Sequence, residues 1–483
     1  TNTTGSAARL CGFVDFNGDG DFADAGEAQA ATVASGSSNL AVNLSFTPPL
    51  VPQPGNRYAR FRLSTDAACN ADGPALDGEV EDYLAAIRLP DFGDLPDTGA
   101  GSGSGNYVTL LADARVAHDI TSTASTLFLG GAVDAEADGQ PNAAANGDDL
   151  ALSPDDEDGL NPLDLVQVQG LPASFRFTAT NTTGAAANLC GHVDWNADGD
   201  FADTAETAAQ VVPTGSTGAS VALNFGNVPS GTAGVRYARF RYSNAPCSQQ
   251  LPTGDAPGAF PNGEVEDYAI DYRLADRGDL PDTGAGSGAG NYATTLADGG
   301  ASHGLVSGLR IGACVDSEDD GQPNAPANGD DNGGGSSTLG SCASAGDDED
   351  GITVADLGFI STLPANVRAV VSNTTGAAAR LCGFVDWNGD GDFGDTVGGV
   401  SEQAQVAVPT GSIGSSVTLA FGNAPIAPVG ASHARFRLST AAGCNANGAV
   451  VDGEVEDYPV TITRRDFGDL PDVVDTKVAG GVV

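Results

Sequence analysis

The sequence is poor in positive charge. Its 483 residues include 20 Lys and Arg against 64 Asp and Glu, and the formal charge is −44. A chain this negative repels the phosphates of nucleic acids and the anionic head groups of lipids. We therefore expect neither nucleic acid nor a bare membrane among its partners. Crowded carboxylates also oppose compaction, so divalent cations are expected among them.

Long apolar runs are missing as well. No segment approaches the ~18 consecutive apolar residues that a membrane-spanning helix needs, which predicts that the chain does not insert into a membrane. Leu, Ile, Val and Phe make up about a fifth of the residues, close to the compositional border of disorder. A core this small needs support from cross-links, ions or neighbouring molecules in addition to apolar burial.

Signals for catalysis are weak. Only four histidines occur, and a Gly-x-Ser-x-Gly match at 101–105 lies in linker-like sequence rather than in a strand-to-helix elbow. Paired carboxylates are abundant, but they recur in every repeat, which suits a scaffold better than a catalyst. We predict that the protein is not an enzyme.

Internal repeats dominate the sequence. Gly-Glu-Val-Glu-Asp-Tyr occurs three times, beginning at Gly78, Gly263 and Gly453, and the flanking segments recur in the same order. Each copy follows an Ala-Arg-Phe-Arg segment and apolar runs that alternate with polar residues, as over 40–46. Alternation with a period of two and turn-rich joints predicts antiparallel β-sandwiches.

The repeats divide the chain into modules and connectors. We predict an all-β fold of tandem antiparallel β-sandwich modules that alternate with loop-rich, acidic, calcium-binding connector modules. The first β module lacks the opening strand of the other two, which predicts an open sheet edge. The predicted segments are 1–90, 160–275 and 352–465 for the β modules, 91–159 and 276–351 for the connectors, and 466–483 for a connector stub that includes a candidate donor strand.

Two of the repeated segments place like charges two residues apart. In a strand, this spacing puts both side chains on one face. We predict a cross-strand ladder between Arg60 and Arg62 on one strand and Glu79 and Glu81 on the other.

The eight cysteines follow the repeats. Six fall at equivalent places in the three β modules, and the other two both lie in the second connector. No Cys-x-x-Cys pair is present, which argues against a zinc site. We predict four disulfides and therefore an oxidising compartment. The predicted pairs are Cys11–Cys69, Cys190–Cys247, Cys314–Cys342 and Cys382–Cys444.

The sharpest chemical signal is an Asp-x-Asn-x-Asp-Gly-Asp segment in each β module. Oxygen ligands at alternate positions, with Gly after the third, let the backbone turn around one hard cation, and we expect Ca²⁺. The closing acid stays open between Glu27, Asp24, Glu79 and the equivalents of each. The candidate ligands are Asp15, Asn17, Asp19, Asp21, Asp194, Asn196, Asp198, Asp200, Asp386, Asn388, Asp390 and Asp392.

A second acidic pattern recurs at fixed spacing in both connectors. A solvated acidic loop is one interpretation of such a charge run, but the recurrence favours ion cages. His118 and His303 occupy matching connector positions, and an isolated histidine is more often a hydrogen-bonded structural residue. The candidate calcium ligands are Asp134, Glu136, Asp138, Asp316, Glu318 and Asp320.

By these residues the chain resembles the GEVED modules of large bacterial cell-surface and secreted proteins, which are named for the motif at Glu79–Asp82. All three copies carry the motif, and the connector pattern is similar to the segments between such modules. The resemblance covers nearly the whole chain. It implies a β-rich module at the cell surface or outside the cell that is adhesive or structural, and it brings no catalytic residues.

We therefore expect an extracellular structural protein, stabilised by calcium and disulfides, that forms or belongs to a surface fibre. The strand-like tail at 473–483 departs from the repeat. We expect the tail, or another segment of a neighbouring copy, to complete the first module head to tail. An equal alternative places the missing strand upstream in the same polypeptide. Other copies or other surface proteins are the expected partners, and the alternative function is a monomeric adhesin for a carbohydrate or protein ligand.

Overall fold

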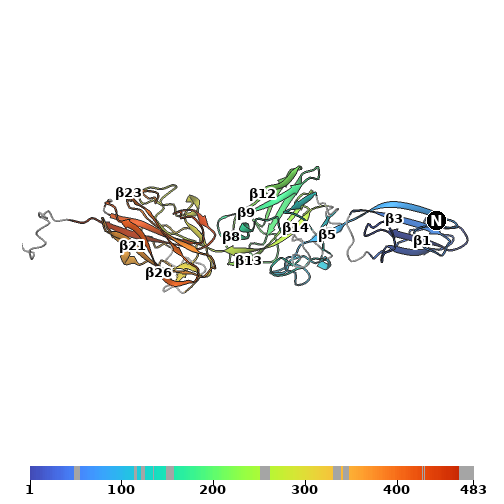
Figure 1. Cartoon of the computed structure of the whole chain (residues 1–483), viewed down its shortest axis with the longest axis horizontal. Coiled ribbons are helices and arrows are strands. Elements are labelled where there is room, and N and C mark those ends of the chain that lie inside the picture. The colour runs from blue at the N-terminus through green and yellow to red at the C-terminus, as the bar shows by residue number, and fades with distance from the viewer. Residues whose placement is uncertain are drawn as a thin grey trace, which may run out of the picture. The chain divides into compact units, whose positions relative to one another are not determined.

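The computed structural model describes residues 1–47, 55–113, 117–120, 126–133, 135–136, 138–147, 157–250, 262–329, 339–340, 348–426, 428 and 430–466. Within these ranges the chain is all-β, as predicted, and the regular structure consists of strands and short 3-10 helices (Figure 1). The described part of the chain contains no helix that is long and apolar enough to cross a membrane.

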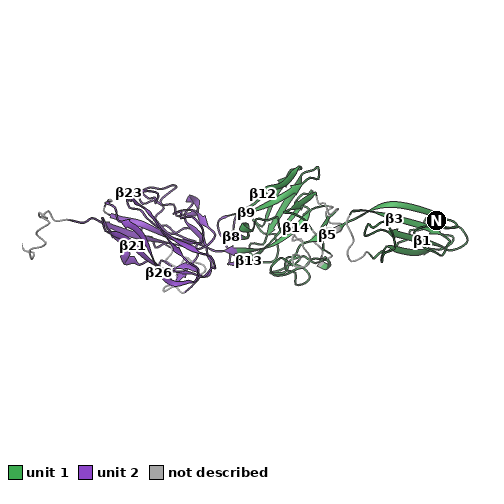
Figure 2. Ribbon diagram, viewed as in Figure 1, with its two compact units in different colours: residues 1–165, 173–226, 235–271 green, residues 166–172, 227–234, 272–483 purple. Residues whose placement is uncertain are grey.

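Contacts divide the chain into two compact units (Figure 2). The first unit holds the first β module, the first connector and most of the second β module, and the second unit holds two short segments of the second module, the second connector and the third β module. The finer division into six segments stays a prediction. The first unit comprises residues 1–165, 173–226 and 235–271, and the second comprises residues 166–172, 227–234 and 272–483.

The first β module is a four-stranded antiparallel sheet in the order β2-β1-β3-β4. Its core is small: Val14, Phe16 and Ala59 are buried, and Phe46 and Phe61 pack against them. The strands are β1 (Ala8–Val14), β2 (Ala28–Val33), β3 (Gly55–Ser64) and β4 (Glu79–Ile87).

The second β module is a sandwich. One sheet has the order β11-β10-β13-β14-β8, and the other has the order β12-β9-β7. The rings of Phe175 and Phe177 on β9 lie 5.3 and 4.7 Å from that of Phe240 on β13, which packs the two sheets face to face. The strands are β7 (Leu127–Leu129), β8 (Val166–Val168), β9 (Pro172–Asn181), β10 (Ala187–Val193), β11 (Thr207–Val212), β12 (Ser216–Asn227), β13 (Gly234–Ser243) and β14 (Glu264–Arg273).

The third β module repeats this sandwich, with sheet orders β20-β29-β27-β22-β25 and β17-β21-β26. Trp387 lies at its centre, with ring distances of 4.9 Å to Phe359 and 5.9 Å to Phe421. The strands are β17 (Leu309–Ile311), β20 (Gly358–Ile360), β21 (Pro364–Asn373), β22 (Ala379–Val385), β25 (Gln403–Val408), β26 (Ser412–Asn423), β27 (Gly430–Ser439) and β29 (Glu454–Thr463), with a small hairpin of β23 (Thr396–Val397) and β24 (Val400–Ser401).

Each connector lends a strand to the module that follows it in sequence. In the first unit β7 pairs antiparallel with β9, and in the second unit β17 pairs antiparallel with β21. The remaining connector elements are short loops with a few paired residues. They are β5 (Leu89–Phe92), β6 (Ala117–Ile120), β15 (Ala275–Arg277), β16 (Ser302–Gly304), β18 (Cys314–Val315), β19 (Leu339–Gly340), η1 (Leu111–Asp113) and η3 (Leu296–Asp298), while β28 (Ala449–Val450), η2 (Pro162–Leu165) and η4 (Val354–Asp356) belong to the β modules.

The predicted disulfides of the β modules are present. They join Cys11 to Cys69, Cys190 to Cys247 and Cys382 to Cys444. Cys314 is also disulfide-bonded, and Cys342, its predicted partner, lies outside the described residues. Disulfides in every β module indicate that the chain matures in an oxidising compartment.

Loss of the Cys382–Cys444 bond is expected to lower the free energy of unfolding of the third β module by about 2–5 kcal/mol, because the bond restricts the unfolded chain. The measurement is chemical denaturation of a Cys382→Ser/Cys444→Ser variant, followed by Trp387 fluorescence in a Trp195→Phe background. Cys11→Ser/Cys69→Ser is the matched control and should leave this transition unchanged. An unaltered Trp387 transition in the first variant would contradict the expectation.

Candidate functional site

A fully buried arginine–aspartate pair lies in the second β module. Arg239 comes from the Ala-Arg-Phe-Arg segment on β13, and Asp267 is the last acid of the Gly-Glu-Val-Glu-Asp-Tyr motif on β14. Both side chains are 0% exposed. Two hydrogen bonds join them, from Nε to Oδ1 at 2.8 Å and from Nη2 to Oδ2 at 2.7 Å. This bidentate geometry both neutralises and orients the carboxylate.

The same pair holds the first connector. Asp267 Oδ2 accepts hydrogen bonds from the backbone N–H groups of Asp94 at 2.8 Å and Leu95 at 3.0 Å, which belong to the Gly-Asp-Leu-Pro-Asp segment. Arg239 Nη1 donates to the carbonyl oxygen of Val108 at 2.7 Å. We call this set of contacts the connector hook.

The second unit repeats the connector hook. Arg435 and Asp457 are both 0% exposed and are joined by two hydrogen bonds of 2.8 Å. Asp457 Oδ2 accepts the backbone N–H groups of Asp279 at 2.9 Å and Leu280 at 3.1 Å. Arg435 Nη1 donates to the carbonyl oxygen of Ala293 at 3.0 Å. The hook is therefore a repeated joint between a connector and the module after it.

The glycine of the connector hook lies directly against the carboxylate. A Cβ atom at Gly93 would lie 2.1 Å from Asp267 Oδ2, and one at Gly278 would lie 2.2 Å from Asp457 Oδ2. No other residue fits at this distance without moving the backbone or the aspartate. The Gly-Asp-Leu order is thus a steric requirement of the joint.

A leucine and a tyrosine complete the joint. Leu280 is fully buried in a cluster that includes Tyr292. The Tyr292 hydroxyl donates to Asp386 Oδ2 at 2.7 Å, and Tyr107 donates to Asp194 Oδ2 at 2.6 Å in the first unit. Asp386 and Asp194 open the calcium-type loops of their modules, so the connector also fixes the base of each loop.

The connector histidines contact the second arginine of Ala-Arg-Phe-Arg. Arg437 Nε donates to His303 Nε2 at 2.8 Å, and His303 Nδ1 lies 2.9 Å from the carbonyl oxygen of Asp452. Burial, and then the Arg437 charge, lower the pKa of His303 well below its usual value. The ring is therefore neutral and carries its proton on Nδ1. Arg241 and His118 form the same contact at 3.1 Å.

The first β module presents the receptor half of the connector hook to solvent. Arg60 and Asp82 make the same two hydrogen bonds, at 2.8 and 2.9 Å. Their side chains are 31% and 56% exposed, against 0% in the other two modules. Arg60 Nη1 turns to the carbonyl oxygen of Ala71 and to Asp72 Oδ1. The receptor is assembled, and its binding side is accessible.

The same strand pair corrects the predicted charge ladder. The register places Arg60 opposite Asp82 and Phe61 opposite Glu81. Because side chains alternate between the faces of a strand, the glutamates project on the face opposite to the arginines. The predicted arginine–glutamate ladder is wrong, and the aspartate is the partner.

A groove crosses the first β module on the glutamate face. Its volume is about 300 Å³. Leu40, which lines the groove, is 54% exposed, whereas in the second module β9 covers this face. Exposed apolar patches of this kind mark interaction surfaces. The groove is lined by Thr1, Leu10, Val33, Leu40, Val42, Phe61, Leu63, Glu79 and Glu81.

The three calcium-type loops share one arrangement. In the third module the fully buried Asp386 accepts backbone N–H bonds within the loop, including that of Gly391 at 3.0 Å. Asn388 Nδ2 lies 2.8 Å from Asp390 Oδ2 and 2.9 Å from Asp395 Oδ2. Asp386 therefore stabilises the loop backbone from the buried side, and Asp390 and Asp395 lie close together on the exposed side. Asp15 and Asn17 in the first module, and Asp194 and Asn196 in the second, make the equivalent bonds.

Two of these loops bring three carboxylates within reach of one ion. Their oxygen atoms lie within 4.8 Å of one another, and all are exposed. Each triad contains the predicted ligands at the fifth and seventh loop positions and one acid from later in the loop. In the second module, Asp198 and Asp200 keep the same backbone contacts. The triads are Asp19, Asp21 and Asp24, and Asp390, Asp392 and Asp395.

The glutamate that follows each loop is buried beneath it. Glu402 accepts the backbone N–H groups of Trp387 and Asp395, both at 3.0 Å. Burial raises the pKa of Glu206 and of Glu402 to about 7. These glutamates, and Glu27 in the first module, support the loop backbone from inside, whereas the motif glutamates contact the connectors.

The predicted connector ligands fall into two groups. Asp138 and Asp320 are exposed, and their Oδ1 atoms accept the first N–H groups of η1 and η3, at 2.6 and 2.7 Å. Glu136, Asp316 and Glu318 are buried. Asp134 lies outside the described residues.

The sequence offered the motif glutamates as closing acids of the calcium-type loops and as partners of the arginines. In the second and third modules they contact the connectors instead. Glu454 accepts the backbone N–H of Ile311, and Glu456 Oε1 accepts that of Gly351 at 2.8 Å. In the first unit, Glu264 and Glu266 make the equivalent bonds to Leu129 and Gly159. A signal was present, because the motif and both ends of the connector recur together in a fixed order.

Comparison with protein families identifies the β modules. The GEVED domain matches residues 9–86, 188–271 and 380–461. The chain belongs to the GEVED domain family. The three matches together cover about half of the chain, and each one ends within the GEVED strand. The resemblance inferred from the motif is confirmed.

Comparison with other proteins adds the following. One solved structure that aligns along the chain is described as giving structural insight into host cell surface retention of a 1.5-MDa bacterial ice-binding adhesin. The two chains are 8% identical, the alignment covers 95% of this chain and 87% of that chain, and the TM-score is 0.21. No curated protein matches the chain.

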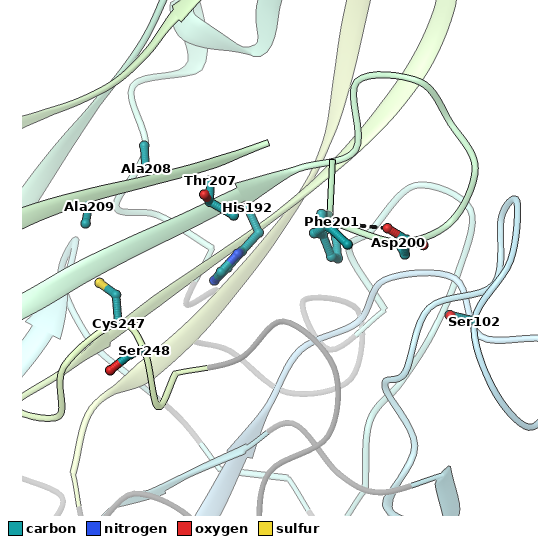
Figure 3. A pocket seen from close by; sticks show the side chains of 10 residues that line it. Ser102, His192, Asp200, Phe201, Thr207, Ala208, Ala209, Cys247 and Ser248 are labelled. Atoms are coloured by element: carbon teal, nitrogen blue, oxygen red, sulfur yellow. Dashed lines mark hydrogen bonds between the residues drawn. The ribbon is translucent and has the colours of Figure 1, made fainter. Parts of the chain in front are cut away.

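A pocket of about 750 Å³ lies beside the calcium-type loop of the second GEVED module (Figure 3). His192 of β10 lines it on one side, and Asp200 and Phe201 line it from the loop (Figure 3). Burial lowers the pKa of His192 to about 3, so the imidazole is neutral and a poor base at pH 7. The pocket can hold a small ligand, and Phe384 replaces the histidine at the equivalent position of the third module.

Replacement of His303 by Leu is expected to destabilise the second unit by about 1–3 kcal/mol at pH 7.5, because buried Arg437 Nε loses its acceptor. Below pH ~6.5 the unfolded chain takes up a proton on His303 and the folded chain does not, so the free energy of unfolding of the parent falls by about 1.4 kcal/mol per pH unit. His303→Leu lacks this group. The difference in free energy of unfolding between the parent and the variant should therefore shrink by about 1.4 kcal/mol per pH unit below pH ~6.5.

Urea denaturation of the parent and His303→Leu at pH 7.5 and pH 5.5 measures this change. His433→Leu, at a partly exposed position on β27, is the control for removal of a histidine as such. A difference between parent and His303→Leu that is the same at both pH values would contradict the neutral buried ring.

Proposed function

We propose that this GEVED protein is an extracellular structural repeat protein, stabilised by calcium and disulfides, whose copies join head to tail in a surface fibre. The observation that carries the proposal is the connector hook. It forms twice within the chain, and the first module presents the same receptor, Arg60 and Asp82, in an accessible form. This accessible pair could bind one more connector, supplied by a neighbouring copy of the chain. If each copy binds the next in the same head-to-tail way, the result is a filament.

The proposed occupant is residues 466–472 of a second copy. Their sequence, Asp-Phe-Gly-Asp-Leu-Pro-Asp, is identical to that of residues 91–97, which form the hook on Asp267. The segment brings the glycine, the two N–H groups and the leucine that the joint uses. Tyr58 is 69% exposed and occupies the position of Tyr237, which packs beside Leu95 in the first unit. It supplies an apolar surface for the incoming leucine.

The predicted donor strand follows this segment. Residues 473–483 lie outside the described part of the chain, and their sequence is rich in Val. Addition of a strand to the groove over Leu40 and Val42 would cover exposed apolar surface of the first module. The pairing of β7 with β9 and of β17 with β21 shows that connectors of this chain already add strands to GEVED modules.

Calcium is the proposed ion of the calcium-type loops. The exposed triads offer only carboxylate oxygens, the ligands that hard cations prefer. Bound cations would also offset part of the formal charge of −44. Disulfides in all three β modules support a location outside the cell.

The second candidate function is a monomeric adhesin that binds a carbohydrate or protein ligand. The pocket beside His192 favours it, because its volume of about 750 Å³ lies within the range of small-molecule sites. An adhesin of this kind would bind its ligand without self-assembly. The state of the chain in solution therefore separates the two functions.

A fluorescent peptide with the sequence of residues 464–472 is expected to bind the full chain, measured by anisotropy. The peptide with Gly468→Ala should not bind, because a Cβ atom at this position lies 2.1 Å from the aspartate in the equivalent joint. Asp82→Ala in the chain should abolish binding, and Asp72→Ala, which removes the other partner of Arg60, should not. Equal binding of both peptides, or a chain that stays monomeric at high concentration, would contradict the assembly.

Calcium is expected to raise the midpoint of thermal unfolding of the non-reduced chain relative to a chelator at matched ionic strength. Saturation at a hundredfold excess over the dissociation constant is worth about 2.7 kcal/mol per site. Asp390→Asn/Asp392→Asn should remove one such contribution. Sodium at the same ionic strength is the control, and stabilisation by sodium equal to that by calcium would assign the effect to charge screening.

A further inference from the structure

The pocket beside the calcium-type loop of the second GEVED module is lined by several elements of one compact unit. His192 belongs to β10, Thr207 to β11 and Phe201 to the loop. Ser248 follows β13, and Ser102 belongs to the first connector. The ring of His192 projects from β10 into the space between Phe201 and Ser248 (Figure 3). The volume of about 750 Å³ lies within the range of small-molecule sites.

His192 is buried in the wall of this pocket without a hydrogen bond of ordinary geometry. It is 5% exposed, and neither Nδ1 nor Nε2 has a hydrogen-bond partner among the described residues. The backbone of Gln250 is close enough to influence the ring, but one peptide group can serve only one of the two nitrogens. A neutral imidazole offers one donor and one acceptor. At least one ring nitrogen is therefore available to a ligand.

The other two modules carry phenylalanine at the position of this histidine. Phe13 and Phe384 are 3% and 0% exposed. Phe384 lies in an apolar cluster with Phe393, which is the equivalent of Phe201. Phenylalanine is thus the residue that packs this place, and a buried imidazole with an unpaired nitrogen is the less stable choice. A departure from the repeat at such a cost indicates a functional demand on the second module.

A second departure from the repeat opens the pocket. Thr207 lies directly opposite His192 in the register of β10 and β11, and Gln403 lies opposite Phe384 in the third module. Gln403 Nε2 donates to the carbonyl oxygen of Phe393 at 3.2 Å, so its side chain reaches from β25 to the calcium-type loop. Threonine is too short to make this contact. The equivalent space therefore stays open in the second module.

The lining favours a neutral molecule that carries several hydroxyl groups. Ser102, Thr207 and Ser248 offer hydroxyls that both donate and accept hydrogen bonds, as the hydroxyls of a sugar do. No Lys or Arg is among the described residues that line the pocket, and an anion would face both Asp200 and a strongly negative chain. The alanines of β11 add an apolar surface for the C–H groups of a sugar ring.

We propose that this pocket binds a neutral sugar, with the imidazole of His192 as a hydrogen-bonding contact and the short side chain of Thr207 keeping the site open. The proposal rests on the second candidate function, for which it names the ligand class and the residues, and it does not depend on head-to-tail assembly. Each chain presents one such site, because Phe13 and Phe384 occupy the equivalent place in the other two modules.

The test measures binding of sugars to the full, non-reduced chain by calorimetry and saturation-transfer NMR. The probes are glucose, galactose, mannose and N-acetylglucosamine, and the disaccharides cellobiose, lactose, mannobiose and chitobiose. At least one probe should bind saturably, at one site per chain. His192→Phe should weaken this binding by about tenfold or more, which corresponds to the loss of roughly one hydrogen bond.

The second variant and its control address the shape of the pocket. Thr207→Gln introduces the side chain that closes this space in the third module, so it should abolish binding. Ala28→Gln makes the corresponding change in the first module, where Ala28 lies opposite Phe13, and it should bind as the parent does.

Thermal unfolding separates a ligand contact from a residue that only packs. Without sugar, His192→Phe should unfold at the same temperature as the parent or above it, because it adopts the packing of the other two modules. A sugar that binds should raise the midpoint of the parent more than that of His192→Phe.

Failure of every probe to bind the parent would overturn the proposal. Binding that His192→Phe and Thr207→Gln both leave unaltered would keep the adhesin candidate and overturn this pocket as its site. Failure of the 464–472 peptide to bind the chain would overturn assembly and leave the sugar result unchanged.

Discussion

Asp267 and Asp457 each accept two hydrogen bonds from an arginine and two from the backbone of a connector, in a place without access to water. A buried carboxylate of this kind is stable only while all of its partners stay in position, and removal of one partner of a buried pair costs about 3–5 kcal/mol. The connector is one of those partners. It therefore belongs to the folded module as much as any strand does, although it is mostly loop.

The period of two residues in a strand explains how one short motif serves two contacts. The aspartate shares a face with the arginines and holds the connector hook, and the two glutamates project from the other face toward the end of the connector. The connector therefore contacts both faces of the GEVED strand. The first module shows what the motif does alone: the arginine–aspartate pair still forms, while its glutamates remain in solvent.

Features encoded locally could be predicted from the sequence. Alternation identified the β modules, and the paired occurrence of cysteines identified Cys11–Cys69 and its equivalents. The partner of Arg60 could not be chosen, because the sequence does not specify the register that places Asp82 opposite it. The connector hook could not be predicted from the sequence for another reason. Asp94 and Asp267 are 173 residues apart, and the donors are backbone N–H groups, which do not depend on residue type. Likewise, the acidic loops were visible as patterns, while the burial of Glu318 and Glu454 depends on what packs over them.

The sequence separation of the connector hook has a consequence for the order of folding. During synthesis a connector emerges well before the GEVED strand that receives it, since Asp279 precedes Asp457 by 178 residues. The connector hook cannot form until the GEVED strand, the last strand of the module, is available. Its contacts, which join residues far apart in sequence, therefore form late. Folds rich in contacts of this kind fold slowly. Until then the acidic, glycine-rich connector has no GEVED strand to bind. Repulsion between its negative charges keeps it soluble and extended during that interval. The same charge that opposes compaction of the folded chain therefore opposes association of the chain before folding is complete.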